Sequence, residues 1–468
     1  MELAPSAVHY APGASERKLL LTAKYQALNA SSLRGLLRER GVSEEIIEIL
    51  EAVASVLPFR VNRYIVEELI DWQEVPDDPI FQLVFPQPGM LPDSDLQAVL
   101  DLRRAKAPEA YIDEEIKRIR ASLNPHPGGQ LELNVPTLSR ARAEGIQHKY
   151  RETVLFFPRE GQTCHAYCSY CFRWAQFVGD SDLKFSNEEA NILPRYLSAH
   201  PEVTDVIFTG GDPMIMGAKR LKRLLDPIIE IETVQNIRIG TKSQAWWPQR
   251  FVSASDADEL MGLLDSISAS GKHLTIMAHY SHPRELEVPL AQQAIGRIRD
   301  TGAIIRGQAP LVRHVNDSSE TWAALWREQV RHGVVPYYMF VERDTGAYEH
   351  FRVPLAEALE IFTGAYSQVS GLSRTVRGPV MSCTPGKVLV DGVATVEKTK
   401  IFVLKLIQAR DPSLVNQVFF AHYDPSASWI EDLRPAFTAS WPWASKSLKA
   451  KHTALPGRAA NANIQHSQ

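Results

Sequence analysis

The 468-residue sequence has only four cysteines, too few for a disulfide-stabilised secreted scaffold of this length. It also lacks any run of about 20 apolar residues, which a membrane-spanning helix requires. The first residues do not show the basic segment and apolar stretch that mark a secretion signal. We therefore expect a cytoplasmic protein with no membrane partner.

Long stretches of one charge are also absent. The 51 Lys and Arg residues nearly balance the 55 Asp and Glu residues, and no basic block is long enough to follow a phosphate backbone. A nucleic-acid partner is therefore not expected. The hydrophobic share of 44% is ordinary for a globular protein, and the chain is long enough for a large core and an accessory domain.

The N-terminal part carries successive helical patterns, which predict a helical domain over residues 15–135. In one of them Ser43 can cap a helix with an acidic first turn and an apolar face formed by Ile46, Ile47, Leu50, Val53, Ala54 and Leu57. Residues 1–14 and 445–468 are expected to be disordered. A loop rich in Pro, Gly and Asn, residues 124–136, is the best linker candidate.

Strand and helix patterns alternate after residue 150. Six runs rich in β-branched and aromatic residues predict strands at Thr153–Phe157, Asp205–Thr209, Asn236–Thr241, His273–His279, Ala303–Gln308 and Pro336–Val341. Helical patterns follow them at Ser186–His200, Arg220–Ile231, Asp256–Ser270, Ala291–Asp300, Glu320–Arg331 and Pro354–Tyr366, the first with Ser186 and Glu189 spaced as a capping box. The alternation favours parallel strands in an open sheet or an incomplete barrel, with chemistry at the C-terminal strand ends. A small β-rich extension is expected over Val388–Tyr423.

Three of the four cysteines crowd into eight positions directly after the first predicted strand, as Cys164-x3-Cys168-x2-Cys171. Three thiolates can bind three irons of a four-iron cluster and leave the fourth iron open to a ligand. A structural zinc normally takes four ligands, for which His165 is the candidate fourth. Zinc, or a plain group of structural cysteines, therefore stays an alternative.

The second predicted strand runs directly into Gly210-Gly211-Asp212-Pro213. Two glycines let a backbone approach a ligand closely, and Asp212 could accept a hydrogen bond from an ammonium group. By itself the segment is also a common turn. Its place after a strand and behind the cysteine motif favours the binding role.

Together these two motifs resemble the radical S-adenosylmethionine superfamily. The resemblance implies a [4Fe-4S] cluster on the three cysteines and a bound S-adenosylmethionine, which is cleaved to a 5′-deoxyadenosyl radical that takes a hydrogen atom from the substrate. It assigns Tyr170 and the segment Gly210, Gly211, Asp212 and Pro213 to the S-adenosylmethionine site. The chemistry also implies an electron donor such as a flavodoxin or a ferredoxin.

From about His148 to Lys387 the sequence resembles the lysine 2,3-aminomutase family more closely. The matching segments are His148-Lys149-Tyr150, Cys164–Arg173, Thr209–Pro213, Ile237-Arg238-Ile239-Gly240, Pro248-Gln249-Arg250, His279–Pro283, Arg313 with Val315-Asn316-Asp317, Pro336-Tyr337-Tyr338, and Glu349–Arg352 with Pro354. The resemblance implies an α/β fold, a partial (β/α)6 barrel over residues 136–375 with an extension over 376–444. It also implies a 2,3-amino shift on an amino acid held by pyridoxal phosphate.

The same resemblance assigns further residues. His279 and Gln308 fall where the family contacts S-adenosylmethionine, although each could be a buried polar group of the core. Arg173 would bind the substrate carboxylate, with a salt bridge at the barrel mouth as the alternative. Lys387 would form the Schiff base with pyridoxal phosphate, with Lys149 and Tyr150 nearby.

Several positions depart from the family pattern. Thr153 and Lys149 stand where the family has two phosphate-binding arginines, Phe340 replaces a tyrosine near the cofactor ring, and the glycine-rich segment before Lys387 is shortened. Arg343 and Cys383 replace two acidic residues that bind the lysine substrate. A cation at position 343 would repel a lysine side chain and attract an anion, unless Arg343 points away and Glu342 or Asp344 takes its place.

The leading hypothesis is therefore an aminomutase acting on an amino acid other than lysine, with the cluster, S-adenosylmethionine and pyridoxal phosphate as cofactors. The first alternative is a radical enzyme without pyridoxal phosphate that carries out an epimerisation, a dehydration or another rearrangement of a carboxylate. The second is a non-catalytic protein built around iron–sulfur or zinc. All three are compatible with a homo-oligomer.

Overall fold

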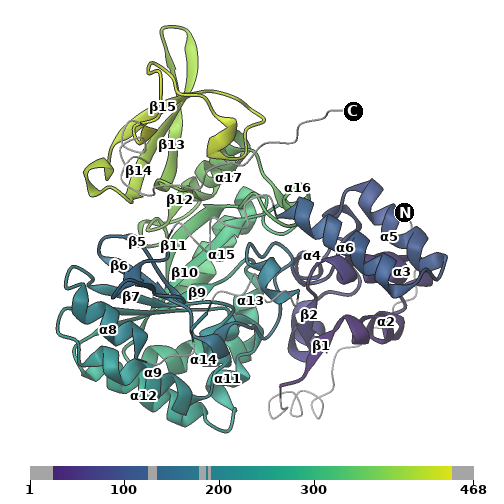
Figure 1. Ribbon diagram of the computed structural model, residues 1–468, viewed down its shortest axis with the longest axis horizontal. Coiled ribbons are helices and arrows are strands. Elements are labelled where there is room, and N and C mark those ends of the chain that lie inside the picture. The colour runs from purple at the N-terminus through teal and green to yellow at the C-terminus, as the bar shows by residue number, and fades with distance from the viewer. Residues whose placement is uncertain (1–24, 125–133, 179–185, 188–190, 445–468) are drawn as a thin grey trace, which may run out of the picture.

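The computed structural model describes residues 25–124, 134–178, 186–187 and 191–444. The expectations of disorder for residues 1–14 and 445–468 lie outside these ranges. None of the helices within them combines the length and the apolarity needed to span a bilayer. Figure 1 shows a helical N-terminal region beside a central sheet flanked by helices, with a smaller β-rich region at one end of that sheet.

Helices dominate the N-terminal region: α2 (Ala30–Glu39), α3 (Glu44–Val56), α4 (Pro79–Val84), α5 (Asp93–Arg104) and α6 (Glu109–Leu123). The Ser43 side chain caps α3 as predicted, since it accepts a hydrogen bond from the Ile46 backbone N–H at 3.4 Å. The apolar face of α3 is buried around Leu50 and Val53. The sequence did not predict the antiparallel strand pair β1 (Ala27–Asn29) and β2 (Arg60–Asn62), nor the π-helical turn Ile65–Leu69.

The six predicted strands of the central sheet are confirmed and run parallel to one another. They are β6 (Thr153–Phe156), β7 (Asp205–Phe208), β8 (Asn236–Thr241), β9 (His273–His279), β10 (Ile304–Leu311) and β11 (Val334–Val341), paired in chain order. Side chains of these strands and of the covering helices form one continuous apolar core, which includes Phe156, Ile239 and Ile276. The carboxyl ends of all six strands therefore lie at one edge of the sheet.

The helices between the strands also follow the predicted order. They are α8 (Ile192–Ala199), α9 (Ala218–Ile229), α12 (Ala257–Ala269), α14 (Pro289–Asp300), α15 (Ser319–Arg331) and α17 (Leu355–Ser367), with short helices α10 (Ser243–Trp246), α11 (Gln249–Val252), α13 (Arg284–Glu287) and α16 (Tyr348–Phe351). The predicted start of the first one was wrong. Asn187 forms a β-bridge with Pro158 instead, and α8 begins at Ile192. Glu189, the other residue of the predicted capping box, is outside the described ranges.

The β-rich extension continues the central sheet. Strand β12 (Arg377–Ser382) runs parallel to β11, and β13 (Gly386–Val396), β14 (Thr399–Ala409) and β15 (Val418–His422) follow as antiparallel neighbours. At the opposite edge β5 (Ile146–Tyr150) pairs with β6. The result is an 11-stranded mixed sheet that begins with β15 and ends with β5, with the small two-stranded pair β3 (Thr137–Leu138) and β4 (Ala141–Arg142) beside it. The fold is therefore the expected α/β one.

The N-terminal region contacts the loop that follows β6. The backbone N–H of Tyr167 donates to the carbonyl of Arg60 at 2.9 Å, and that of Ser169 donates to the carbonyl of Leu83 at 2.9 Å. The boundaries predicted at residues 135, 136, 375 and 376 remain predictions. The contacts show that the loop with the three cysteines is held from two sides, by the sheet and by the N-terminal helices.

Candidate active site

The loop after β6 carries Cys164, Cys168 and Cys171, none of which forms a disulfide. Burial raises the pKa of Cys168 to about 12 and that of Cys171 to about 11, and it also raises the pKa of Cys164. Buried thiols of this kind become thiolates only when a cation lies beside them. Three such thiols on one loop fit the three-iron side of a four-iron cluster.

The alternative of a zinc site completed by His165 receives no support from the position of that ring. Within the described ranges, no three His, Cys, Asp or Glu side chains, the three cysteines included, surround one ion-sized position, so this finding does not distinguish zinc from a cluster. The buried His165 ring places Nδ1 2.8 Å from the Ser243 hydroxyl, and burial lowers its pKa to about 3. His165 thus contacts the end of β8.

Arg60, on β2 of the N-terminal region, fixes the first cysteine. Its guanidinium donates to the Thr163 hydroxyl and to the carbonyl of Cys164, the latter at 3.2 Å, and lies 5.0 Å from the Tyr167 ring centroid. A guanidinium that serves two acceptors and one ring face holds the loop backbone in a single arrangement. This role could not be predicted from the sequence, because Arg60 lies about a hundred residues before the motif.

Gly210 and Gly211 lie at the end of β7, where they were predicted to let a ligand approach. The structure shows that they let the cysteine loop approach, and the approach of a ligand stays a prediction. A Cβ on Gly210 would lie 2.2 Å from the Gln162 side chain, and a Cβ on Gly211 would lie 2.5 Å from the Thr163 carbonyl oxygen. Gly210 also has a φ of +147°, which favours glycine.

The Asp212 carboxylate accepts hydrogen bonds from the protein itself, and its role as an acceptor for a ligand ammonium stays a prediction. Oδ1 accepts from the Met214 N–H at 2.9 Å, and Oδ2 accepts from the Lys242 N–H and the Ser243 hydroxyl, each at 2.9 Å. The Thr241 hydroxyl lies within 2.9 Å of both oxygens. Burial raises the pKa of Asp212 while these donors oppose the rise. Asp212 therefore joins the ends of β7 and β8, and Pro213 opens the 3₁₀ turn that follows.

The remaining residues predicted for S-adenosylmethionine lie at the same edge. His279 ends β9 and is the register partner of Gln308 on β10. Burial, aided by the charge of Lys242, lowers the pKa of His279 to about 3, so the ring is neutral. Tyr170 is buried, with its hydroxyl 2.9 Å from that of Ser281 just beyond β9. The structure thus brings together three of these side chains from the cysteine loop, β9 and β10.

Lys387, at the start of β13, lies among aromatic rings. Its Nζ is 4.6 Å from the ring centroid of Tyr338, 5.8 Å from that of Tyr150 and 5.9 Å from that of Phe340. No described carboxylate lies within ion-pair distance of it. Burial, helped by neighbouring cations, lowers the pKa of Lys387 to about 7. A buried, partly neutral amine is suited to act as a nucleophile.

A second lysine faces the same ring. Lys149 Nζ lies 5.4 Å from the Tyr150 centroid and donates to the carbonyl of Cys383, in the turn that precedes Lys387. Burial lowers the pKa of Lys149 to about 7, and Arg343 adds to this effect. The Cys383 side chain is buried, which raises the pKa of its thiol. Lys149, Tyr150, Cys383 and Lys387 therefore form one cluster.

Arg173 and Arg343 lie between this cluster and the cysteine loop. The Arg343 guanidinium is 5.4 Å from the Phe172 ring centroid, and that of Arg173 is 4.3 Å from the Phe157 centroid. Burial lowers the pKa of Arg173 to about 10, and Arg343 contributes to the lowering. Neither guanidinium has an ion-pair partner among the carboxylates of the described residues.

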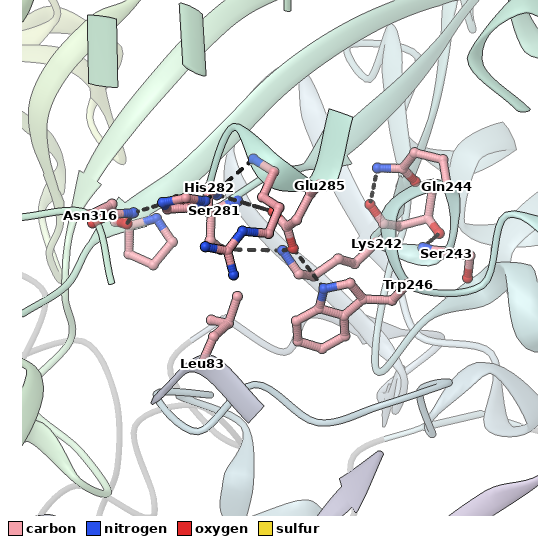
Figure 2. Close-up of polar contacts among 12 residues, drawn as sticks. Leu83, Lys242, Ser243, Gln244, Trp246, Ser281, His282, Glu285 and Asn316 are labelled. Carbon is pink, nitrogen blue, oxygen red and sulfur yellow. Dashed lines mark hydrogen bonds and ion pairs between the residues drawn. The ribbon is translucent and has the colours of Figure 1, made fainter. Parts of the chain in front are cut away.

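Figure 2 shows a buried network that the sequence analysis missed. Lys242 Nζ lies 2.7 Å from Glu285 Oε1, and their side chains are 10% and 0% exposed. Lys242 directly follows β8, and Glu285 lies in α13, the short helix that follows β9. Their positions next to strand ends could have marked both as candidates, whereas their pairing could not be predicted.

Comparisons with known proteins agree with this arrangement, although no family model matches the sequence. The chain is 30% identical over 392 residues to a protein of Aquifex aeolicus assigned as an L-lysine 2,3-aminomutase, covering 84% of this chain and 91% of that protein. It is 28% identical over 313 residues to the L-lysine 2,3-aminomutase of Haemophilus influenzae, covering 62% and 87%. With the enzyme of Fusobacterium nucleatum the identity is 30% over 227 residues, covering 48% and 50%.

Among solved structures, a radical S-adenosylmethionine methyltransferase from Sphaerobacter thermophilus matches 49% of this chain and 66% of its own, with a TM-score of 0.35 and 16% identity. That likeness is too distant to assign any residue. The Aquifex match spans almost the whole of both proteins and includes the cysteine loop. The chain therefore belongs to the lysine 2,3-aminomutase family of radical S-adenosylmethionine enzymes.

Proposed function

We propose that the protein is an aminomutase-type enzyme whose substrate is a 2-amino acid with an anionic side chain. The observation that carries the substrate class is the cationic wall that Arg343 provides near Lys149. The family's lysine-binding acidic residue aligns with Arg343, and the second one aligns with Cys383. A wall of this charge repels an ammonium group and attracts a carboxylate.

The position of Arg343 supports the proposal. Its charge acts on both Lys149 and Arg173, so the three cationic side chains lie near one another. Burial holds the pKa of the neighbouring Glu342 well above its usual range despite Arg343, which favours an uncharged carboxyl. Glu342 is therefore a poor substitute for the family's carboxylate.

Separate residues of this chain would bind the substrate and anchor the cofactor. Arg173, beside the cysteine loop and without an ion-pair partner among the described residues, would bind the α-carboxylate with its planar fork. Arg343 would bind the side-chain anion, and Lys387 would supply the amine that anchors pyridoxal phosphate. When bound, the cluster and S-adenosylmethionine supply a radical that removes a hydrogen atom, and pyridoxal phosphate supplies the carbonyl that carries the amino group.

One observation favours the alternative without pyridoxal phosphate. Thr153, at a position where the family has a phosphate-binding arginine, donates to Asp205 Oδ2 at 3.0 Å. Arg238 also donates to Asp205, with its Nε 2.8 Å from Oδ1, so this guanidinium is already paired. The phosphate would then depend on Lys149 and on Arg377, which stacks on Tyr338 at 4.2 Å.

The substrate is tested with reconstituted enzyme and amino acids deuterated at C3. L-Glutamate should transfer deuterium to 5′-deoxyadenosine and yield a 3-amino product, whereas L-lysine should not. Arg343→Ala should lower kcat/KM for the acidic substrate by about 30-fold or more, because truncating one partner of a buried charge pair costs about 2–5 kcal/mol. Arg343→Lys should keep more of the activity. Efficient turnover of lysine by the unaltered enzyme would contradict the proposal.

A further inference from the structure

The Lys242–Glu285 pair is part of a larger network, because both oxygens of the carboxylate accept further hydrogen bonds. Glu285 Oε1 also accepts from the Trp246 indole N–H at 2.6 Å, and Oε2 accepts from the backbone N–H groups of Ser281 at 2.5 Å and His282 at 3.1 Å. A buried carboxylate with four donors is fixed in place. It joins the end of β8 to the loop after β9 (Figure 2).

The ammonium group continues the network toward the cysteines. Lys242 Nζ lies 3.2 Å from the Ser281 hydroxyl, which in turn lies 2.9 Å from the Tyr170 hydroxyl. Tyr170 stands between Cys168 and Cys171 in the sequence. A chain of contacts therefore leads from a buried cation to the middle of the cysteine loop.

A third strand end also holds this chain. The Asn316 side-chain amide donates to the carbonyl of Ser281 at 2.9 Å and to that of Pro310 at 3.1 Å, while its oxygen accepts from the Val312 N–H at 2.8 Å. Asn316 lies in the loop that follows β10. Ser281 is thus fixed through its N–H, its carbonyl and its hydroxyl, and Tyr170 docks on a rigid support.

The order of the contacts decides which end of the ion pair is linked to the cysteines. The Lys242 ammonium stands between the Glu285 carboxylate and the Ser281–Tyr170 hydroxyl pair that leads to the cysteine loop. The cation end of the pair is therefore the end linked to that loop. Charges and hydrogen bonds near the ligating sulfurs are among the features that set the potential of an iron–sulfur cluster.

We propose that Lys242, held by Glu285 and linked to Tyr170 through Ser281, positions the cysteine loop and raises the reduction potential of the cluster bound there. The inference rests on the proposed cluster, not on the identity of the substrate. A nearby positive charge stabilises the reduced cluster, which carries one more electron than the oxidised one. The three side chains act through Tyr170 and the cysteines, so they are positioning residues.

The test is a redox titration of reconstituted enzyme without S-adenosylmethionine, followed by electron paramagnetic resonance. Lys242→Met, Ser281→Ala and Tyr170→Phe should each shift the midpoint to a more negative potential, with the largest shift for Lys242→Met. Lys242→Arg keeps the charge and should stay close to the unaltered enzyme. Thermal unfolding of the apoproteins shows which variants fold. If Lys242→Met does not fold, the midpoint of Ser281→Ala tests the inference.

Unchanged or more positive midpoints in the folded variants would overturn the inference while leaving the proposed function in place. Failure of the unaltered protein to bind iron is a different outcome, because it would remove the proposed function together with the inference that rests on it. The iron content of every sample is therefore measured alongside its midpoint.

Discussion

Replacing Lys387 by alanine is expected to abolish covalent capture of pyridoxal phosphate and all amino-group migration. The Lys387 amine is enclosed by Tyr150, Tyr338 and Phe340 and has no described ion-pair partner, so nothing else in its surroundings uses it. Borohydride reduction of the loaded enzyme followed by mass spectrometry should place the cofactor on a peptide that contains Lys387. The variant should show no such peptide.

Lys149→Met is the matched control, because Lys149 faces the same Tyr150 ring and burial lowers both pKa values to about 7. This variant should bind the cofactor more weakly and still form the covalent product at Lys387. Capture at Lys149 would contradict the role proposed for Lys387, and no capture in the unaltered enzyme would favour the alternative without pyridoxal phosphate.

The same capture should depend on pH in a defined direction. Only the neutral amine attacks a carbonyl, and burial lowers the pKa of Lys387 from its ordinary value to about 7. The initial rate of capture should therefore rise as the pH increases through about 7 and level off above it. An exposed lysine would still show a rising rate several pH units higher. Rates measured by rapid borohydride quenching distinguish the two profiles.

Removing the Asp212 side chain should destabilise the protein even without any cofactor. Asp212→Ala leaves the backbone N–H groups of Met214 and Lys242 without their buried acceptor, which costs about 1–3 kcal/mol for each group. We expect a loss of about 2–6 kcal/mol in the free energy of unfolding, measured by denaturant titration of the apoprotein. Asp212→Asn keeps one acceptor oxygen and should lose less.

An unchanged stability of the Asp212→Ala apoprotein would favour the ligand-binding role predicted from the sequence. If Asp212→Ala leaves the stability of the apoprotein unchanged and weakens only the binding of S-adenosylmethionine, the carboxylate serves the ligand. The four donors around Asp212 make the stability loss the expected result.

Local patterns were sufficient to predict the elements of the barrel. Strands β8 and β9 begin and end where their β-branched runs do, and α3 begins after the Ser43 cap. The start of α8 was misplaced because Asn187 forms a bridge with Pro158, which a capping pattern does not reveal. Motifs formed by residues close together in the sequence, such as the three cysteines, could also be identified from the sequence.

Contacts between distant segments could not be read in this way. Gly210 and Gly211 were correctly singled out as positions that need a small residue, yet the group that approaches them is the loop at Gln162 and Thr163. The pairing of Lys242 with Glu285 depends on the register of β8 and β9. In both cases the residue type indicated a position of interest. The residue that it contacts could not be predicted, because the fold determines which distant segments meet.

The most direct test of the radical-enzyme assignment is anaerobic reconstitution with iron and sulfide, followed by reduction in the presence of S-adenosylmethionine. The purified protein should bind about four irons per chain, and 5′-deoxyadenosine should form. Cys168→Ala should lose both the cluster and the product. A stoichiometric zinc without iron, or an iron-loaded protein that releases no 5′-deoxyadenosine, would contradict the assignment.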